Sequence, residues 1–161
     1  MCSEKLNNSQ YSALGDEQYI LDMEMFIGKK SSYYLKQFNK IKAGDRIISW
    51  NWAGMIFGAY WFAYRKMYFY VAVYTIVETV NLYFFDRKYG ITSYIFTVIS
   101  ALFGNYLYMK HIERNIEKYR NLETGKRKDY INRHKGTEKW AAVFVFIFAL
   151  ILFKLGILDG R

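Results

Sequence analysis

Four long apolar blocks limit what this chain can fold into. They cover residues 50–64, 67–85, 91–109 and 140–158. Glu78 and Lys154 are the only charged side chains within them, and the whole sequence contains no proline, the residue that most disrupts a helix. A 19-residue helix spans about 28 Å, close to the hydrocarbon thickness of a bilayer. We therefore predict an all-α integral membrane protein rather than a soluble bundle, whose helices would keep a polar stripe.

The distribution of lysine and arginine predicts the topology of these blocks. Residues 110–139 carry ten bases and residues 1–49 carry seven, whereas the connection 86–90 carries two. Basic segments remain on the cytosolic side of a membrane, so both long polar segments should share that side. Three transmembrane helices meet this condition, namely 67–85, 91–109 and 140–158. The shorter block 50–64 is then an interfacial or re-entrant helix within a membrane domain that covers residues 50–158.

The first 49 residues predict a flexible tail and a small helical module. Residues 1–15 are polar and form the tail, and residues 16–49 form a cytosolic helical module. An acidic helix over 16–26 should end near Gly28, because glycine accepts the left-handed conformation that closes a helix. A module of this size cannot bury a core of its own. We therefore expect it to dock on the membrane surface or on a later cytosolic helix.

A second short helix should follow within the module. Ser31 or Ser32 is placed as its N-cap, and Gly44 is placed as its stop. Leu35, Phe38 and Ile41 recur at three-residue intervals and form one apolar face. The spacing predicts an amphipathic helix that lays this face against a neighbour.

Residues 110–139 form the other polar region. Apolar side chains at helical spacing continue the third block past the predicted membrane: Tyr108, Ile112, Ile116 and Tyr119. We expect this helix to end at Gly125, a basic linker to follow, and Thr137 to cap the last block. The acidic helix 16–26 should pack on it, with Ile20, Leu21 and Met23 facing Ile112, Ile116 and Tyr119.

The block 50–64 is rich in aromatic side chains, which favour an interface between water and lipid. Gly54 and Gly58 are four residues apart and permit close helix contact. Packing within the chain is the preferred interpretation of this pair, and a homo-oligomer interface is the alternative.

Two stretches carry a recognisable pattern. The first reads FIGKKSSYYLKQFNKI over residues 26–41, and the second reads SWNWAGMIFGAYWFAYRKMY over residues 49–68. They resemble a bacterial domain-of-unknown-function family of small inner-membrane proteins, whose pattern is F-x-G-K-N, paired tyrosines, N-W-x-A-F and W-x-x-Y-R-K-M-Y. The matching positions, with a later family element, are Phe26, Gly28, Lys29, Tyr33, Tyr34, Asn51, Trp52, Trp61, Tyr64, Arg65, Lys66, Met67, Tyr68, Asn105, Tyr108 and His111.

The resemblance covers residues 26–119. Lys30 replaces the usual asparagine, and Gly54 stands where alanine is commoner. It implies a bacterial inner-membrane protein, which in our topology has a cytosolic N-terminus and an external C-terminus. It implies no reaction.

One polar site is predicted inside the apolar blocks. Its members are Thr75, Glu78, Asn81, Thr97 and Lys154. A carboxylate within a bilayer is costly, and such groups often carry protons or bind ions. Glu78 should therefore have a polar partner, either Thr97 or Lys154. The alternative to a transport role is that Glu78 only holds helices together through hydrogen bonds.

Signatures of catalysis are absent from the sequence. His111 and His134 lie apart, without cysteine or paired carboxylates at ligand spacing, and Cys2 is the only cysteine. The sequence contains no nucleophile elbow, no phosphate-binding loop and no dinucleotide fingerprint. We therefore predict no enzyme, no catalytic residues, no metal and no cofactor. The net charge of +9 is explained by anionic headgroups rather than by nucleic acid.

Two classes of function remain. The preferred one is a non-enzymatic structural, regulatory or partner-recruiting role exercised through the cytosolic module. The alternative is an oligomeric channel or transport subunit, with Thr75, Glu78 and Asn81 lining the path. Three spans without a repeat disfavour a transporter. The expected partners are an anionic lipid bilayer, further copies of the chain and a protein bound by the cytosolic module.

Overall fold

The computed structural model describes residues 12–44, 46–84 and 91–158, and side chains in parts of this range only. Within that range the chain is helical. The helices are α1 (Glu17–Ile27), α2 (Ser31–Ala43), α3 (Trp52–Phe57), α4 (Ala59–Tyr64), α5 (Tyr68–Phe84), α6 (Ile91–Asn121), α7 (Thr124–His134) and α8 (Lys139–Leu158). The described residues exclude several positions named above, namely Cys2, most of the tail 1–15, the connection 86–90, the C-terminal residue and the Lys154 side chain.

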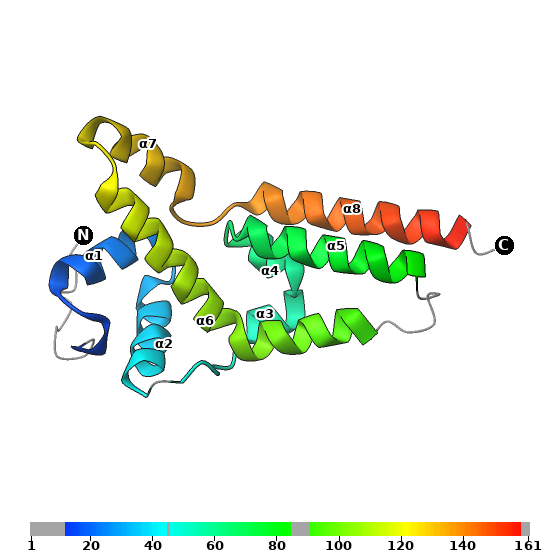
Figure 1. Cartoon of the computed structure of the whole chain (residues 1–161), viewed down its shortest axis with the longest axis horizontal. Coiled ribbons are helices and arrows are strands. Elements are labelled where there is room, and N and C mark those ends of the chain that lie inside the picture. The colour runs from blue at the N-terminus through cyan, green and yellow to red at the C-terminus, as the bar shows by residue number, and fades with distance from the viewer. Residues whose placement is uncertain (1–11, 45, 85–90, 159–161) are drawn as a thin grey trace. The chain divides into compact units, whose positions relative to one another are not determined.

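The chain divides into two compact units that alternate along the sequence (Figure 1). Unit 1 consists of Met1–Trp50 and Phe103–Gly136, and unit 2 consists of Asn51–Leu102 and Thr137–Arg161. The long helix α6 contributes its first residues to unit 2 and the remainder to unit 1. Each unit is therefore assembled from two separate stretches of chain.

The described helices include none that combines enough length with enough apolar sequence to cross a membrane. Two predictions are therefore wrong. The first is the integral membrane fold with three transmembrane helices. The second is the inner-membrane localisation with a cytosolic N-terminus and an external C-terminus. The overturned spans are 67–85, 91–109 and 140–158. One physical reason is visible in α5, which has 17 residues, fewer than the about 20 apolar residues of a typical span. Thr75, Glu78 and Asn81 interrupt its apolar run further.

Unit 1 begins with the predicted acidic helix. The Asp16 carboxylate accepts a hydrogen bond from the Tyr19 N–H at 2.7 Å, and this bond caps the first turn of α1. Gly28 ends α1 with a positive φ of 66°, as the sequence predicts. Lys30, with φ of 69°, precedes α2 in place of the predicted serine cap, and Gly44 follows the end of α2 as predicted.

The core of unit 1 lies between α1, α2 and the second half of α6. Its buried side chains are Ile20, Met23, Phe26, Ile27, Tyr34, Leu35, Phe38, Ile41, Tyr108, Met109, Ile112 and Ile116. Phe26 meets Tyr119 edge-on with ring centroids 5.8 Å apart, which confirms that the acidic helix packs on α6. Leu21 was expected in this contact but is 45% exposed, so that part of the prediction is wrong.

A separate helix, α7, replaces the predicted basic linker. Helix α6 ends at Asn121 rather than at Gly125, which lies in the first turn of α7. The aromatic ring of Tyr130 anchors α7, because it packs against Phe26 with centroids 6.3 Å apart. The Gly136 N–H also donates to the Phe26 carbonyl at 2.8 Å. These contacts tie the segment to unit 1, which its charge pattern alone does not reveal.

Unit 2 is built around α4, which packs against α5 and α8. The predicted single helix 50–64 is broken into α3 and α4 at Gly58, whose φ of 46° suits glycine. Asn51 caps α3 by accepting from the Gly54 N–H at 2.9 Å. A Cβ added to Gly54 would lie 2.5 Å from the Ser100 carbonyl oxygen. Gly54 thus serves close packing within the chain.

Large apolar side chains also cover much of the described surface of unit 2. On α5, α6 and α8 the exposed ones include Phe69, Ile76, Val80, Tyr94, Val98, Trp140, Phe144, Ile147 and Ile151. An exposed patch of this kind usually marks a contact surface.

Candidate binding site

The polar site predicted from sequence lies along one face of α5. Thr75, Glu78 and Asn81 follow at three-residue spacing, so their side chains share a face of the helix. The Thr75 hydroxyl donates to the Val71 carbonyl of its own helix at 2.9 Å. The Thr75 hydroxyl proton is therefore used in a hydrogen bond within its own helix. The three residues therefore form a polar stripe on α5, and no described helix supports an intramembrane site.

Thr97 lies on α6, which packs against α5 in unit 2. The Tyr74 and Phe96 rings approach with centroids 4.5 Å apart, and Thr97 follows Phe96 directly. The contact brings the helices of Glu78 and Thr97 together. Pairing of Glu78 with Thr97 stays a prediction, and its pairing with Lys154 concerns a side chain outside the described residues.

Many positions of the sequence pattern have structural roles. Tyr34 and Tyr108 stack edge-on in the core of unit 1 with centroids 4.9 Å apart. Trp61 and Arg65 are buried in unit 2, and Lys66 has a left-handed φ of 60° at the turn after α4. Lys29, Tyr33, Trp52 and Tyr68 are exposed. The pattern therefore describes mainly a packing framework.

Asn105 connects this framework to a surface site. Its side-chain amide is fully buried and donates to the Ser49 hydroxyl oxygen at 3.1 Å and to the Trp50 carbonyl at 3.2 Å. These bonds fix the segment that runs from α2 toward α3 against α6. The segment is thereby held at the edge of a hollow in unit 1.

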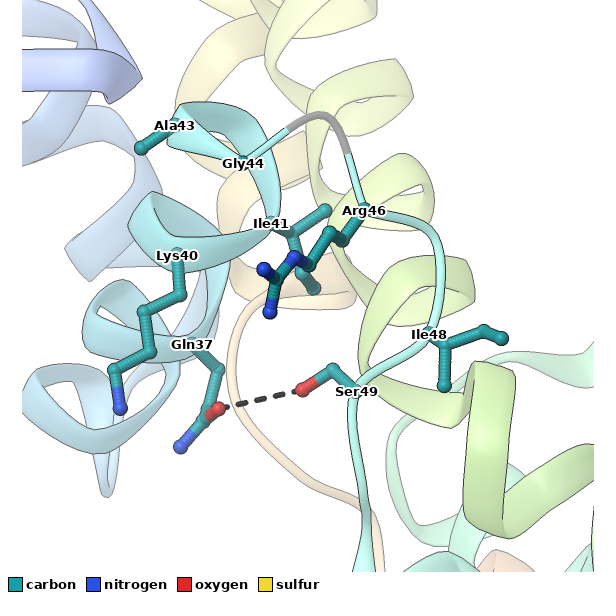
Figure 2. A pocket seen from close by; sticks show the side chains of 8 residues that line it. All are labelled: Gln37, Lys40, Ile41, Ala43, Gly44, Arg46, Ile48 and Ser49. Atoms are coloured by element: carbon teal, nitrogen blue, oxygen red, sulfur yellow. Dashed lines mark hydrogen bonds between the residues drawn. The ribbon is translucent and has the colours of Figure 1, made fainter.

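The hollow lies at the C-terminal end of α2 and has a volume of about 420 Å³ (Figure 2). Its lining residues are Gln37, Lys40, Ile41, Ala43, Gly44, Arg46, Ile48 and Ser49. Figure 2 shows that Gln37 and Lys40 extend from α2 and that Arg46 extends from the segment that follows it, and all three line the hollow. Among the described residues that line it, two are cationic and none is acidic. The hollow therefore favours a ligand with negative charge.

A second hollow, of about 330 Å³, shares Ile41 and Arg46 with the first. Its remaining lining residues are Ala13, Lys42, Ile47, Tyr106, Met109 and Lys110. Arg46 thus borders both spaces, and the neighbouring Ile47 and Ile48 are 51% and 58% exposed. We call the surface formed by the two hollows and this segment the Arg46 surface. It combines positive charge with exposed apolar side chains.

One carboxylate offsets part of the positive charge at the second hollow. Glu113 pairs with Lys42 and with Lys110, each at 2.9 Å. Burial alone would raise the pKa of Glu113, but the hydrogen bonds from Lys110 and Lys42 outweigh burial and lower it. The same hydrogen bond raises the pKa of Lys110. The two lysines of the second hollow are therefore held by Glu113, whereas no salt bridge is recorded for Lys40 or Arg46 among the described residues.

His111 occupies a different environment, between α6 and α7. Its Nε2 lies 3.0 Å from the Asn115 amide nitrogen, and the Tyr130 hydroxyl donates to the Asn115 oxygen at 2.9 Å. Burial, reinforced by the nearby His134, lowers the pKa of His111 to about 4. His111 is thus neutral at pH 7 and accepts a hydrogen bond. Over the described ranges, no three His, Cys, Asp or Glu side chains gather as metal ligands would.

Sequence analysis did not identify the polar and charged residues of the Arg46 surface as a site. Lys40 and Arg46 flank the helix stop at Gly44, where basic residues commonly favour the helix dipole without any further role. Gln37 and Ser49 are twelve residues apart and meet only because the chain turns after α2. The exposed pair Ile47 and Ile48, directly after Arg46, is the one sequence signal that could have indicated this surface.

Comparison with known proteins adds one match. No curated protein and no solved structure matches the chain significantly. One family model matches residues 22–114, more than half of the chain, and this range includes α2 and all of the Arg46 surface except Ala13. The chain belongs to the family described as protein of unknown function (DUF2628).

Proposed function

We propose that this chain is a non-enzymatic, partner-recruiting protein whose unit 1 binds an acidic segment of another protein. The observation that carries the proposal is the Arg46 surface. Lys40 and Arg46 border a hollow that no described acidic residue lines, and Ile47 and Ile48 are exposed beside it. A segment with both acidic and apolar side chains matches this combination.

Charge and apolar contact would have separate effects in such a complex. Cations at the rim of an interface steer an acidic partner and set the rate of association more than the affinity. Apolar side chains that leave water supply most of the binding free energy. Arg46 and Ile48 lie close enough to line the same hollow. One bound segment could therefore use both.

The chemistry of Ser49 supports a binding role. Ser49 is the one hydroxyl among the residues that line the first hollow. Its proton is directed to the Gln37 amide oxygen, which is 3.3 Å away. An amide oxygen cannot act as the general base that a nucleophilic serine requires. The hydroxyl therefore suits a structural link better than a reaction.

The test is binding of a synthetic peptide of alternating glutamate and leucine to the full-length chain, measured by fluorescence anisotropy. We expect the double variant Lys40→Glu with Arg46→Glu to weaken binding at least tenfold at low salt. The matched control, Lys128→Glu with Lys135→Glu, makes the same change of charge at exposed positions of unit 1 away from the hollow. It should weaken binding less than threefold.

Two outcomes would contradict the proposal. Equal losses in both double variants would mean that the peptide senses only net charge. Binding to phosphatidylserine vesicles that depends on Lys40 and Arg46, without binding of the peptide, would assign the surface to lipid headgroups instead of a protein segment.

A further inference from the structure

We infer that the hollow in Figure 2 is an oxyanion subsite, in which the Gln37 amide N–H groups, the Lys40 ammonium and the Arg46 guanidinium receive one carboxylate or phosphate group. This inference rests on the proposed function, because it names the group of the partner that the Arg46 surface engages. It depends on how Gln37 is held.

A chain of hydrogen bonds orients Gln37. The buried Asn105 amide donates to the Ser49 hydroxyl oxygen at 3.1 Å, and the Ser49 hydroxyl donates to the Gln37 oxygen at 3.3 Å. The Ser49 oxygen is therefore an acceptor toward α6 and a donor toward α2. Because the Gln37 oxygen accepts from Ser49, its NH₂ group is left as the part that can bind a ligand.

Among the described residues, the polar lining of the hollow is then composed of donors. The Lys40 ammonium and the Arg46 guanidinium can only donate, and the Gln37 oxygen and the Ser49 hydroxyl are engaged with each other. A ligand that fits must supply acceptors and negative charge, since each unmatched donor it covers would lose its water. Oxyanions with two or more oxygens meet this need, and guanidinium groups bind them with two parallel hydrogen bonds.

Neutral acceptors fit less well. A backbone carbonyl would satisfy one donor and leave both cations without a counter-charge. The hollow, at about 420 Å³, is larger than a single oxyanion needs, so the group can enter while still attached to a peptide. The inference therefore covers two sources of one chemistry, namely an acidic side chain and a phosphorylated side chain.

The experiment follows the side-chain amide signals of the ¹⁵N-labelled full-length chain by NMR during titration with sodium phosphate, sodium acetate or sodium chloride at equal ionic strength. We expect the Gln37 NH₂ signals to shift and saturate with phosphate or acetate and not with chloride. Gln18 is the internal control, because its amide nitrogen lies 3.3 Å from Asp22 on α1, away from the hollow. Its signals should remain in place.

Ser49→Ala tests the orienting chain without any change of charge. It removes the donor to Gln37, so the amide can rotate, and phosphate affinity should fall three- to tenfold. Gln37→Glu removes the NH₂ signals of Gln37, so phosphate binding is followed there through the backbone amide of Arg46, which lines the same hollow. The negative charge that this variant introduces should abolish saturation. Unchanged phosphate affinity in both variants would overturn the inference.

Two peptides distinguish the source of the oxyanion. They share one sequence and carry phosphoserine or glutamate at a single position, and the tighter binder identifies the source. If the glutamate–leucine peptide binds through Lys40 and Arg46 while Gln37 never shifts, the subsite is wrong and the proposed function stands. If phosphate saturates Gln37 but neither peptide binds, the subsite stands and the recruiting function is wrong.

Discussion

Arg120 on α6 reaches back across 98 residues of sequence to Asp22 on α1, and both its Nε and its Nη2 lie 2.8 Å from the same carboxylate oxygen. The Asp22 side chain is almost fully buried, whereas that of Arg120 is 43% exposed. The two partners would therefore behave differently if separated. Arg120 could turn its charge to water, but Asp22 would remain as a buried charge without its cation.

This asymmetry gives the first prediction. We expect Arg120→Met to lower the free energy of unfolding by about 2 kcal/mol, a value reduced for solvent screening of the exposed end. Asp22→Asn should cost about 1 kcal/mol, because the amide still accepts a hydrogen bond. Urea denaturation measures both. Lys126→Gln, which breaks the exposed pair with Glu123, is the control and should cost about 0–0.5 kcal/mol. A larger loss for Asp22→Asn than for Arg120→Met would contradict this account.

The second prediction concerns pH. The pKa of His111 is about 4 in the folded chain, because burial disfavours its charged form, against an ordinary value of 6.5. The unfolded chain therefore binds the proton more readily below pH 6.5. Stability from this group is complete above pH 6.5, declines as the pH falls, and is lost below about pH 4, with a total of about 3 kcal/mol.

Thermal unfolding of the wild type and of His111→Gln, measured between pH 7 and pH 4, checks this prediction. Glutamine keeps a hydrogen-bond acceptor for Asn115 without a titrating ring. The variant should lose less stability on acidification than the wild type. Parallel pH profiles for the two proteins would show that another group is responsible.

The third prediction tests the close approach at Gly54. Gly54→Ala places a methyl group 2.5 Å from the Ser100 carbonyl oxygen, and backbone cannot move aside cheaply. We expect a loss of about 1–3 kcal/mol in unfolding free energy. Gly125→Ala is the matched control, because nothing lies within 4 Å of its added Cβ and it lies in the first turn of α7. That variant should be neutral or stabilised by up to about 1 kcal/mol.

The fourth prediction concerns the apolar surface of unit 2. Phe144 and Ile147 on α8 are exposed, and we expect them to promote self-association of the chain. Replacing both by lysine should reduce the oligomeric fraction by more than half in light scattering coupled to size exclusion. Thr124→Lys with Asn132→Lys adds the same charge at exposed polar positions of α7 and should leave it unchanged. A wild type that remains monomeric at all concentrations would contradict the prediction.

Local chemistry made part of the fold predictable. Gly28 and Gly44 as stops each act within one helical turn, so a short window of sequence contains the whole signal. The continuation of α6 beyond residue 109 was predictable for the same reason, because apolar residues recur at helical spacing.

Other features depend on residues that are distant in sequence. Helix α7 is fixed by Tyr130 against Phe26, and no pattern within the basic segment predicts that contact. The Arg46 surface was missed because Asn105 holds Ser49 in place across 56 residues. The membrane prediction was based on the length of the apolar blocks and on their low content of charged residues. It gave too little weight to the polar stripe that Thr75, Glu78 and Asn81 form on α5.

The interleaving of the two units has a consequence for how this chain emerges from the ribosome. Helix α1 leaves the exit tunnel long before Arg120 and Tyr119, which complete its packing. At ordinary rates of translation the delay is roughly 5 to 20 seconds. During that interval α1 and α2 have only each other to pack against, because α6 has not yet emerged. Nascent chains stalled before residue 103 should therefore be the form of this protein that most needs a chaperone.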